Sequence, residues 1–447
     1  MITAVLLIPA VYGRAQKFSS ISSQIDTALH QLIDIWYPRV ADTTFGGFLP
    51  NWSYDWKKQE DTLKGIVTQA RHTWSTSKAA RIFPEKVGLR RIADLGFQFM
   101  QNFMWDDQFG GFYEFRDRTG KTHDANGFKN TKRMYGNAFA IYALTAYYEL
   151  TNNGNALQLA IHTFDWIESH SRDPVYGGYF NQLFRDGTPM HLGNASGNGW
   201  DSAYAGLKDY NSSIHVLEAY TDLYHIWPDP RLREALEDII SMIRNRFIMD
   251  RGHLHLFYHA DWTPVSYIDS SDTARRIHVY LDHVSFGHDV ETAYLLHEAQ
   301  EILEISPDPA FEKIMRHLMD HAIQYGWDEE KGGLFEAAYY YKGDRVPTVI
   351  DTRKTWWVQA EALNAFLLMA SLYPEDNQYI HCFEKQWQYI QKYLIDHRYG
   401  GWFETGLDHG RDNWKQHKAH HWKTTYHNLR ALLNCSHRLA SPDFNSP

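Results

Sequence analysis

A short glycine-rich signature recurs along almost the whole chain and constrains its fold more than any other feature. Two adjacent glycines stand between an aromatic or basic residue and a large apolar residue, at Gly46-Gly47, Gly110-Gly111, Gly177-Gly178, Gly332-Gly333 and Gly400-Gly401. The copies are about 65 residues apart, except for one gap of about twice that length. A degenerate copy at 250–254 fits inside this gap. The chain therefore reads as six similar units.

Each glycine pair separates two helical patterns, in which apolar residues recur at three- and four-residue spacing. The pattern before the pair covers 21–37, 88–104, 155–170, 231–248, 309–325 and 377–395. The pattern after it covers 65–83, 133–151, 207–226, 287–304, 354–372 and 423–439. Paired glycines are typical of a tight turn that needs positive φ. Six helical hairpins without polar capping units favour a closed ring over an open stack.

The sequence therefore predicts an all-α fold, an (α/α)6 barrel of six helical hairpins in a single domain over residues 16–440, followed by a tail at 441–447. The second helix of each pair carries more tryptophan, histidine and small residues than the first. We therefore assign the second helices to the inner ring of the barrel.

Composition excludes several classes of protein. Of the 447 residues, 44% are hydrophobic and 15% aromatic, which is enough for a large core. A formal net charge of −10 argues against nucleic acid as a partner. No apolar run approaches the roughly 20 residues of a membrane-spanning helix. Cys382 and Cys435 cannot form a disulfide framework, and no CxxC pair is present for zinc or redox chemistry.

The first 15 residues resemble a secretory signal peptide. An apolar stretch from Ala4 to Val11 precedes Gly13-Arg14-Ala15, where small residues occupy both positions that matter for cleavage. No lysine or arginine precedes the apolar stretch. Two outcomes stay open: an exported, periplasmic protein whose mature chain starts near Gln16, or a cytoplasmic protein in which residues 1–15 are an ordinary terminal segment.

Candidate chemistry collects near the starts of the second helices, which a closed ring brings to one rim. Arg71, His215, His288 and His427 come from four different units. Histidine titrates near neutrality and can act as acid or base, and arginine is well suited to an oxyanion. The structural alternatives are core histidines with satisfied hydrogen bonds and an arginine held in a salt bridge.

Two of these histidines share a local pattern. His215 with Glu218, and His288 with Glu291, both read His-x-x-Glu, a spacing that puts the two side chains on one helix face. A carboxylate beside an imidazole raises its basicity and fixes its tautomer. Inward Glu-x-x-His pairs build di-iron sites in helical bundles. Because the order is reversed here, we expect no metal.

Trp356 and Trp357 stand at the mouth of the predicted barrel and are candidates for stacking on a sugar ring. Adjacent residues on a helix point about 100° apart, so at most one of them faces the cavity squarely. Glu361 is expected near the same rim. We interpret His72 and the pair His420-His421 as surface or supporting residues.

Five segments together resemble the N-acylglucosamine 2-epimerase superfamily, which includes cellobiose 2-epimerases, mannose 2-epimerases and aldose–ketose isomerases. They are Gln69-Ala70-Arg71, Asn211…His215-x-x-Glu218-Ala219, Gly287-His288-Asp289-x-Glu291, Trp356-Trp357-x-Gln359-Ala360-Glu361 and Tyr426-His427-Asn428. The resemblance covers nearly the whole chain after residue 20. It implies an (α/α)6 barrel, in agreement with the repeat.

The resemblance also implies roles for individual residues. His288 and His427 resemble the two catalytic acid/base histidines, and His215 and Arg71 resemble residues that hold and polarise the substrate oxygens. The supporting carboxylates would be Glu218, Glu291 and Glu361. The sugar contacts would be Tyr135, Asn211, Trp357 and Trp422.

The chain departs from the pattern of cellobiose 2-epimerases at two places. Those enzymes commonly read Met-Asn-Thr-His-Leu-His where this chain has 210–215, and they commonly carry a proline where Thr425 stands. These departures favour D-mannose and D-glucose as the epimer pair. Cellobiose 2-epimerase and aldose–ketose isomerase activity remain alternatives. A glycoside hydrolase and a sugar-binding protein without activity are further ones, and a monomer and a homodimer are equally open.

The expected chemistry is inversion at C2 of a ring-opened aldose. One histidine removes the C2 proton, Arg71 and His215 steady the cis-enediolate, and the other histidine returns a proton to the opposite face. This chemistry needs no cofactor, and no phosphate-binding glycine loop appears in a suitable context.

Overall fold

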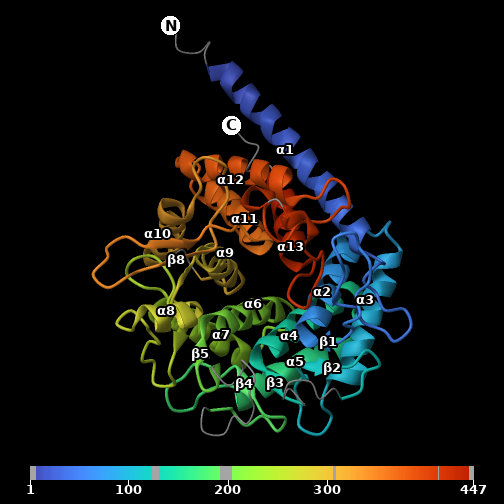
Figure 1. The fold of residues 1–447 in the computed structure, drawn as a ribbon. Coiled ribbons are helices and arrows are strands. Elements are labelled where there is room, and N and C mark those ends of the chain that lie inside the picture. The colour runs from blue at the N-terminus through green and yellow to red at the C-terminus, as the bar shows by residue number, and fades with distance from the viewer. Residues whose placement is uncertain (1–6, 123–129, 192–203, 306–308, 411, 442–447) are drawn as a thin grey trace.

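The computed structural model describes residues 7–122, 130–191, 204–305, 309–410 and 412–441. Two concentric rings of helices dominate it, and Figure 1 looks down their common axis. The inner ring consists of α2 (Ile66–Ile82), α4 (Met134–Thr151), α6 (Tyr210–Ile226), α9 (Phe286–Ile302), α11 (Trp356–Leu372) and α13 (Tyr426–Ala440). The outer ring consists of α1 (Leu7–Trp36), α3 (Gly88–Phe99), α5 (Gly154–His170), α7 (Pro230–Met242), α10 (Pro309–Gly326) and α12 (Asn377–Tyr389).

The inner ring is closed, because each of its helices packs on the next and α13 packs on α2. Each inner helix also packs against the outer helix that follows it in the chain, and α13 packs against α1. The hairpin that closes the ring therefore takes its helices from opposite ends of the chain. The predicted (α/α)6 barrel and the assignment of the second helices to the inner ring are both confirmed.

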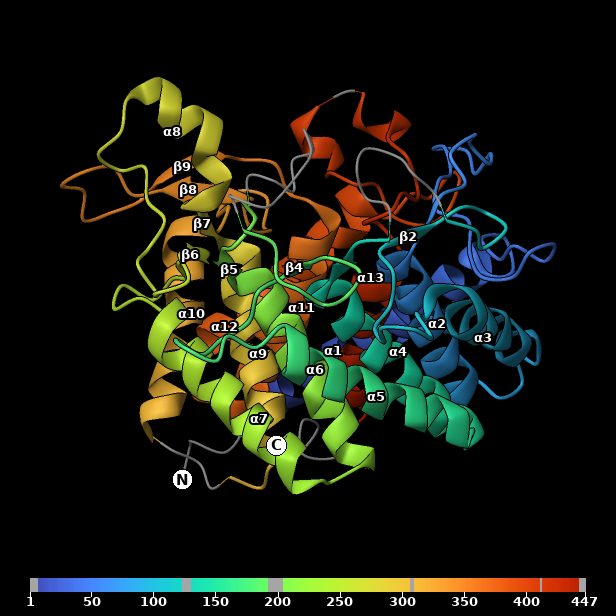
Figure 2. The same ribbon diagram turned by 90° about the horizontal axis from the view of Figure 1, so that it is seen from below.

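The glycine pairs lie in the long connections from outer to inner helices, whereas short turns lead from each inner helix to the next outer one. Short strands in these connections join neighbouring units. They form the antiparallel pairs β1 (Lys64–Gly65) with β2 (Phe115–Arg116), β3 (Lys132–Arg133) with β4 (Gln182–Leu183), and β5 (Lys208–Asp209) with β6 (Phe257–Tyr258). The remaining sheet is β7 (Val284–Ser285), β8 (Ala337–Tyr339) and β9 (Thr348–Asp351). Figure 2 shows the strands and long connections gathered at one end of the rings.

The remaining elements are short. Three outer helices, α3, α7 and α12, continue as π-helical turns η1 (Met100–Met104), η3 (Ile243–Phe247) and η5 (Ile390–Leu394). The long connections also contain α8 (Asp272–His278), η4 (Val279–Leu281), η6 (Leu407–His409) and η7 (Asn413–Lys415). None of the described helices is both long and apolar enough to cross a membrane.

The N-terminal helix begins earlier than its apolar pattern suggests. α1 starts at Leu7 and runs without a break past Gln16, near which the signal-peptide interpretation places the cleavage point. In Figure 1 its first turns project beyond the ring. Residues 1–6 and 442–447 lie outside the described part, so the signal peptide and the C-terminal tail stay predictions.

The turn at each glycine pair is held by a buried ion pair that recurs in five units. An aspartate before the glycines contacts a lysine from the same unit's connection, and these side chains are almost completely buried except Asp328, which is partly exposed. The nitrogen–oxygen distances are 3.2 Å for Lys64–Asp42, 3.0 Å for Lys132–Asp106, 2.8 Å for Lys208–Asp173, 2.7 Å for Lys354–Asp328 and 2.5 Å for Lys418–Asp396. Sequence reasoning identified the glycine pairs but missed these ion pairs.

The glycines themselves are required by close approach to the inner helix. Gly47 has a φ of +66°, and a Cβ atom there would lie 2.4 Å from the side-chain oxygen of Gln69. That oxygen accepts a hydrogen bond from the backbone N–H of Phe48 at 2.7 Å. The degenerate fourth copy behaves alike: Gly252 has a φ of +84°, and Asp289 of α9 accepts the N–H of Leu254 at 3.0 Å.

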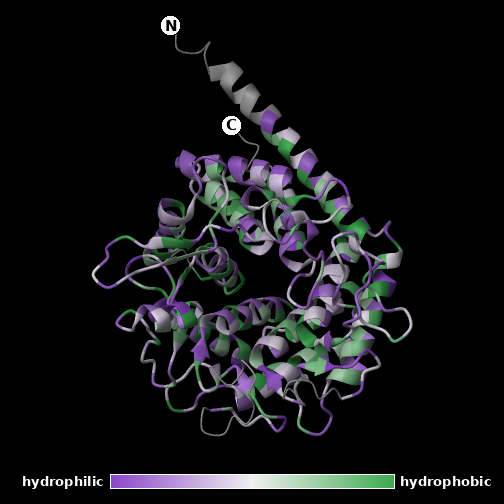
Figure 3. Cartoon of the chain, viewed as in Figure 1, coloured by the Kyte–Doolittle hydropathy of each residue, from purple (hydrophilic) through white to green (hydrophobic). Residues whose placement is uncertain are grey.

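A continuous hydrophobic core includes residues of both rings. Figure 3 shows apolar and hydrophilic positions mixed on helices of both rings. The inner helices are buried on nearly all sides over their first turns, so polar residues there are enclosed by protein. Polar side chains in the first turns of the inner helices therefore need hydrogen-bond partners within the protein.

Candidate active site

The four predicted catalytic residues lie in the first two turns of inner-ring helices. Arg71 belongs to α2, His215 to α6, His288 to α9 and His427 to α13. These helices start at the end of the barrel where the strands and long connections gather (Figure 2). The ring thus carries the four side chains, from positions up to 356 residues apart, to the same end of the barrel.

His427 is held by a carboxylate from the neighbouring helix. Its Nδ1 lies 2.5 Å from Oε1 of Glu361 on α11, and only 5% of the residue is exposed. Because a carboxylate only accepts hydrogen bonds, Nδ1 carries the proton and Nε2 keeps a free lone pair. Burial lowers the pKa of His427 to about 3, although Glu361 opposes this effect. The ring is therefore a neutral base at physiological pH.

His215 shows the predicted pairing within its own helix. Its Nδ1 lies 2.9 Å from Oε2 of Glu218, one turn later on α6. The ring also packs against the aromatic rings of Tyr135 and Phe139, at centroid distances of 5.2 and 4.6 Å. Burial lowers its pKa, against the influence of Glu218. The His-x-x-Glu interpretation is thus correct in geometry for this pair.

The same interpretation fails for His288. Its buried Nδ1 has no hydrogen-bond partner in the part of the chain that the structure describes, and Glu291 binds Arg430 instead. The ring centroids of His288 and Trp357 lie 4.8 Å apart. The ring centroid of His427 lies 5.9 Å from that of the same tryptophan. Burial, and then nearby histidines, lower the pKa of His288 to about 3. One tryptophan thus contacts both histidines.

Arg71 has the environment of a group kept for a ligand. It donates hydrogen bonds to the hydroxyl of Tyr135 at 2.9 Å and to the carbonyl of Trp422 at 2.8 Å. No carboxylate among the described residues forms an ion pair with it, and its buried Nε has no partner there. Its guanidinium lies over the ring of Phe139. The salt-bridge alternative for this arginine is therefore not what the structure shows.

The other predicted sugar contacts divide into two groups. Tyr135 is buried beside Arg71, half-buried Asn211 contacts its hydroxyl, and Trp422 is 37% exposed with its ring 6.2 Å from that of Tyr135. Trp356 instead is buried against His420 and does not contact His288 or His427. Of the two adjacent tryptophans, Trp357 is the one at the histidines.

His72 differs from its interpretation as a surface or supporting residue. It is 1% exposed, and its Nδ1 lies 2.9 Å from the hydroxyl of Tyr37 on the outer side of α2. Burial lowers its pKa to about 3. It is a core histidine, which its position next to Arg71 in the sequence did not reveal.

A buried arginine that the sequence reasoning missed joins the carboxylates. Arg430 of α13 contacts Glu218, Glu291 and Glu361, which come from three other helices. Although burial opposes it, the Arg430 charge holds the pKa of Glu218 and Glu361 at about 2. Burial, and then the charge of Glu361, raise the pKa of Glu291 to about 8. The sequence signal was the spacing of Arg430 one turn after His427.

The same cluster has the spacing of a metal site. Potential ligand atoms of Glu291, Glu361 and His427 lie within 4.8 Å of one another. However, Arg430 donates hydrogen bonds of 2.7 Å to both glutamates. The guanidinium supplies the positive charge that a metal ion would bring, so these residues fit an arginine better than a metal ion.

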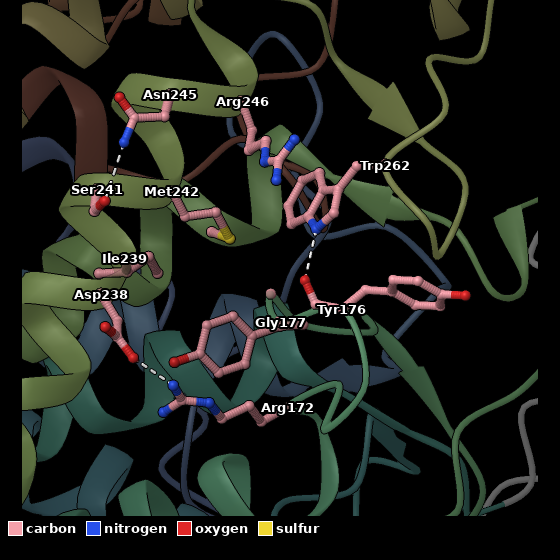
Figure 4. Close-up of a pocket in the computed structure, with 12 residues that line it drawn as sticks. Arg172, Tyr176, Gly177, Asp238, Ile239, Ser241, Met242, Asn245, Arg246 and Trp262 are labelled. Atoms are coloured by element: carbon pink, nitrogen blue, oxygen red, sulfur yellow. Dashed lines mark hydrogen bonds and ion pairs between the residues drawn. The ribbon is translucent and has the colours of Figure 1, made fainter.

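A pocket of about 330 Å³ lies elsewhere, on the outer side of the barrel. Figure 4 shows it between α7 and the third glycine turn, with Trp262 above and the Arg172–Asp238 ion pair below. The indole nitrogen of Trp262 donates to the carbonyl of Tyr176 at 2.8 Å. None of the predicted site residues lines this pocket, so it is separate from the histidines.

Comparison with known proteins places the chain in a family. A family model described as N-acylglucosamine 2-epimerase (GlcNAc 2-epimerase) matches residues 47–431. The chain belongs to this N-acylglucosamine 2-epimerase family. All of the inner-ring residues discussed above lie within the matched range.

Named relatives agree with this membership. A cellobiose 2-epimerase of Bacteroides fragilis is 27% identical, over 90% of this chain and 95% of its own length. A D-mannose isomerase of Marinomonas mediterranea is 23% identical, over 91% and 95%. The solved cellobiose 2-epimerase of Spirochaeta thermophila superposes with a TM-score of 0.78 at 28% identity, covering 95% of this chain and 98% of that one. The protein is an enzyme of the epimerase and isomerase class.

Proposed function

We propose that the protein is a sugar 2-epimerase that reversibly inverts C2 of an aldose, with D-mannose and D-glucose as the first pair to test. The observation that carries this proposal is the contact of Trp357 with the rings of both His288 and His427. These histidines come from separate helices on either side of α11. Two bases on different sides of one carbon are what inversion at that carbon requires.

The chemistry follows from the acidity of a proton next to an aldehyde. One histidine takes the C2 proton of the open-chain sugar, and the C2–H electron pair forms a C1–C2 double bond while negative charge develops on the C1 oxygen. Arg71, which has no carboxylate partner among the described residues, stabilises that oxygen. His215, whose proton lies on Nδ1 beside Glu218, offers Nε2 as a hydrogen-bond acceptor to a sugar hydroxyl. The second histidine delivers a proton to the opposite face of C2, and the C1 carbonyl re-forms.

Neutral histidines suit the first step of this cycle. Burial keeps the pKa of His288 and His427 low, so each ring starts with a lone pair available. The anionic enediolate then favours a positive charge beside it, which opposes the effect of burial. Protonation of a ring is therefore favoured only while the intermediate is present, and the neutral base is restored with the product.

Cellobiose is the second candidate substrate, with inversion at its reducing-end glucose. Relatives 26% to 28% identical over most of the chain carry the name cellobiose 2-epimerase. Trp422 supplies a structural reason, since its indole is 37% exposed next to Tyr135 and could stack on a second ring. The D-mannose isomerase relative keeps a third outcome, in which the proton returns to C1.

Proton NMR in heavy water distinguishes these outcomes. The purified protein is incubated with D-mannose and, separately, with cellobiose. We expect glucose carrying deuterium at C2 from mannose; fructose would assign an isomerase, and change in cellobiose alone would assign the disaccharide reaction. His288→Ala and His427→Ala should lose epimerisation and lose exchange at C2, or at least the half of the two-base cycle that the replaced histidine serves. Unchanged sugars with the wild type, or normal epimerisation by either variant, would overturn the proposal.

A further inference from the structure

Arg430 is the only cation hydrogen-bonded to three buried carboxylates in the part of the chain that the structure describes. It is 3% exposed and stands at the fifth position of α13. One terminal nitrogen donates to Glu218 of α6, and the other donates to Glu291 of α9 and Glu361 of α11, each at 2.7 Å. Three of the five other inner-ring helices thus meet at one guanidinium.

Two of those carboxylates are the ones that hold histidines. Glu218 uses its second oxygen for Nδ1 of His215, at 2.9 Å. Glu361 uses the oxygen bound by Arg430 for Nδ1 of His427, at 2.5 Å. A continuous chain of hydrogen bonds therefore runs from His215 through Glu218, Arg430 and Glu361 to His427. Its two ends lie on α6 and on α13, across the ring from each other.

The surroundings leave Arg430 as the main counter-charge of this chain. Tyr426 and Tyr294 donate hydroxyl hydrogen bonds to Glu218 and Glu361 but carry no charge, because burial raises their pKa values. Tyr142 of α4 is neutral for the same reason. The other cation facing the histidines is Arg71 of α2, which binds Tyr135 and Trp422 and no carboxylate of the cluster.

We propose that Arg430 is a positioning residue for proton transfer: it fixes the two carboxylates that orient His215 and His427, and it keeps both imidazoles neutral with Nε2 free toward the substrate. The proposal rests on the proposed function for its kinetic part only. Arg430 does not reach the sugar in this scheme, because its hydrogen bonds go to the carboxylates and to Tyr426.

The electrostatic consequence has a definite sign. Burial, and then the charge of Arg71, lower the pKa of both His215 and His427, and the charge of Arg430 lowers it further. Removing Arg430 takes a cation away from each histidine–carboxylate pair, so each pair takes up a proton at higher pH, which favours imidazolium. An imidazolium has no lone pair at Nε2 and cannot accept the C2 proton. Loss of Arg430 should therefore move the acid limb of kcat/KM to higher pH.

Three variants test this inference. Arg430→Met removes the charge, and Arg430→Lys keeps it but cannot serve three carboxylates with a planar fork. Arg438→Met is the matched control on the same helix, because Arg438 lies about three turns beyond His427 and binds Asn364 and Glu298 instead of the cluster. We expect Arg430→Met to move the acid limb up by at least about one pH unit, a tenfold loss at a fixed pH below it. Arg430→Lys should lower kcat by about 10- to 100-fold with the acid limb nearly in place.

A spectroscopic measurement separates this proposal from the proposed function. Nitrogen-15 NMR of the histidine side chains reports tautomer and charge without any substrate. The wild type should show two imidazoles protonated at Nδ1 alone down to mildly acid pH, and Arg430→Met should show them turning into imidazolium at higher pH. Wild-type protein without sugar activity would overturn the proposed function alone.

Two results would overturn the role of Arg430. One is an acid limb and histidine titration in Arg430→Met that match those of Arg438→Met. The other is a uniform loss of activity at every pH that follows the folded fraction measured by circular dichroism, since that is the result of a purely structural residue. If Arg430→Met does not fold, the same titration in Arg430→Lys must show Nδ1-protonated imidazoles together with the reduced kcat.

Discussion

The buried carboxyl of Glu291 should carry a proton at neutral pH, which makes its replacement by glutamine an informative perturbation. Burial and the nearby charge of Glu361 raise its pKa from the ordinary 4.5 to about 8. Arg430 can neutralise only part of the charge of three carboxylates, and Glu218 and Glu361 are the two that stay ionised. Glutamine has nearly the shape of the neutral acid, so Glu291→Gln should fold with nearly wild-type stability at pH 6.

The sign of the pH dependence follows from proton linkage. A folded-state pKa above the unfolded one contributes stability that is fully present below pH 4.5 and is lost as pH rises through about 8. The whole difference corresponds to on the order of 5 kcal/mol. Between pH 6 and pH 9 the wild type should lose about 2 to 3 kcal/mol through this one group. Glu291→Gln cannot ionise there and should lose none of it.

Urea unfolding of both proteins at pH 6, 7, 8 and 9 gives the comparison. Other titrating groups contribute equally to both proteins, so the difference in unfolding free energy isolates Glu291. Glu361→Gln tests the cause of the shift, because the charge of Glu361 helps to raise the pKa of Glu291. In that variant the pKa of Glu291 should fall, so its loss of stability should begin at lower pH than in the wild type. A difference between wild type and Glu291→Gln that stays constant from pH 6 to 9 would show that Glu291 is ionised, and would refute the reasoning.

Three further predictions concern single contacts. His427→Asn should lower kcat at least about 100-fold with a small change in KM, measured as deuterium exchange at C2; exchange at the wild-type rate would contradict its role. Lys418→Met should destabilise the fold by about 3 kcal/mol in urea, since it leaves Asp396 buried without its cation, 2.5 Å away in the wild type. Gly47→Ala should cost about 1 to 3 kcal/mol because of its positive φ and the close approach of Gln69. Gly343→Ala, with the same φ region and open space, should cost less, and equal costs would count against the clash.

The architecture could be predicted because its information is local and repeated six times. Apolar spacing placed the inner helices within three residues of their observed starts, for example 133–151 against Met134–Thr151. The start of α6 was placed too early, at 207 against Tyr210, because Lys208 and Asp209 pair with β6 of the neighbouring unit before the helix begins. Such pairing depends on residues about 50 positions away, which a periodicity within one segment cannot register.

The site was predictable as a set of residues but not as a set of contacts. The His-x-x-Glu spacing identified the contact between His215 and Glu218, because both residues lie on one helix. It assigned Glu291 to His288, whereas the structure gives Glu291 to Arg430. The carboxylate of His427 comes from Glu361, 66 residues away. Side chains of one inner helix pair with side chains of other inner helices. The spacing of residues within a single helix carries no information about such contacts between helices.

The fourth unit shows how the repeat and the site constrain each other. Its turn is one residue shorter than those of the other units. The aspartate of this turn, Asp250, is exposed, so the turn has no buried aspartate that could neutralise a lysine. At the position of the buried lysine this unit has Val284, two residues before its inner helix. A lysine there would be buried without a partner, at a cost that burial of an unpaired charge makes large. Asp289 takes over the hydrogen bond to the turn, and the residue beside it is His288. The unit that lost the common ion pair is thus the one that supplies the histidine without a carboxylate partner, as expected if its connection is shaped by the site more than by the repeat.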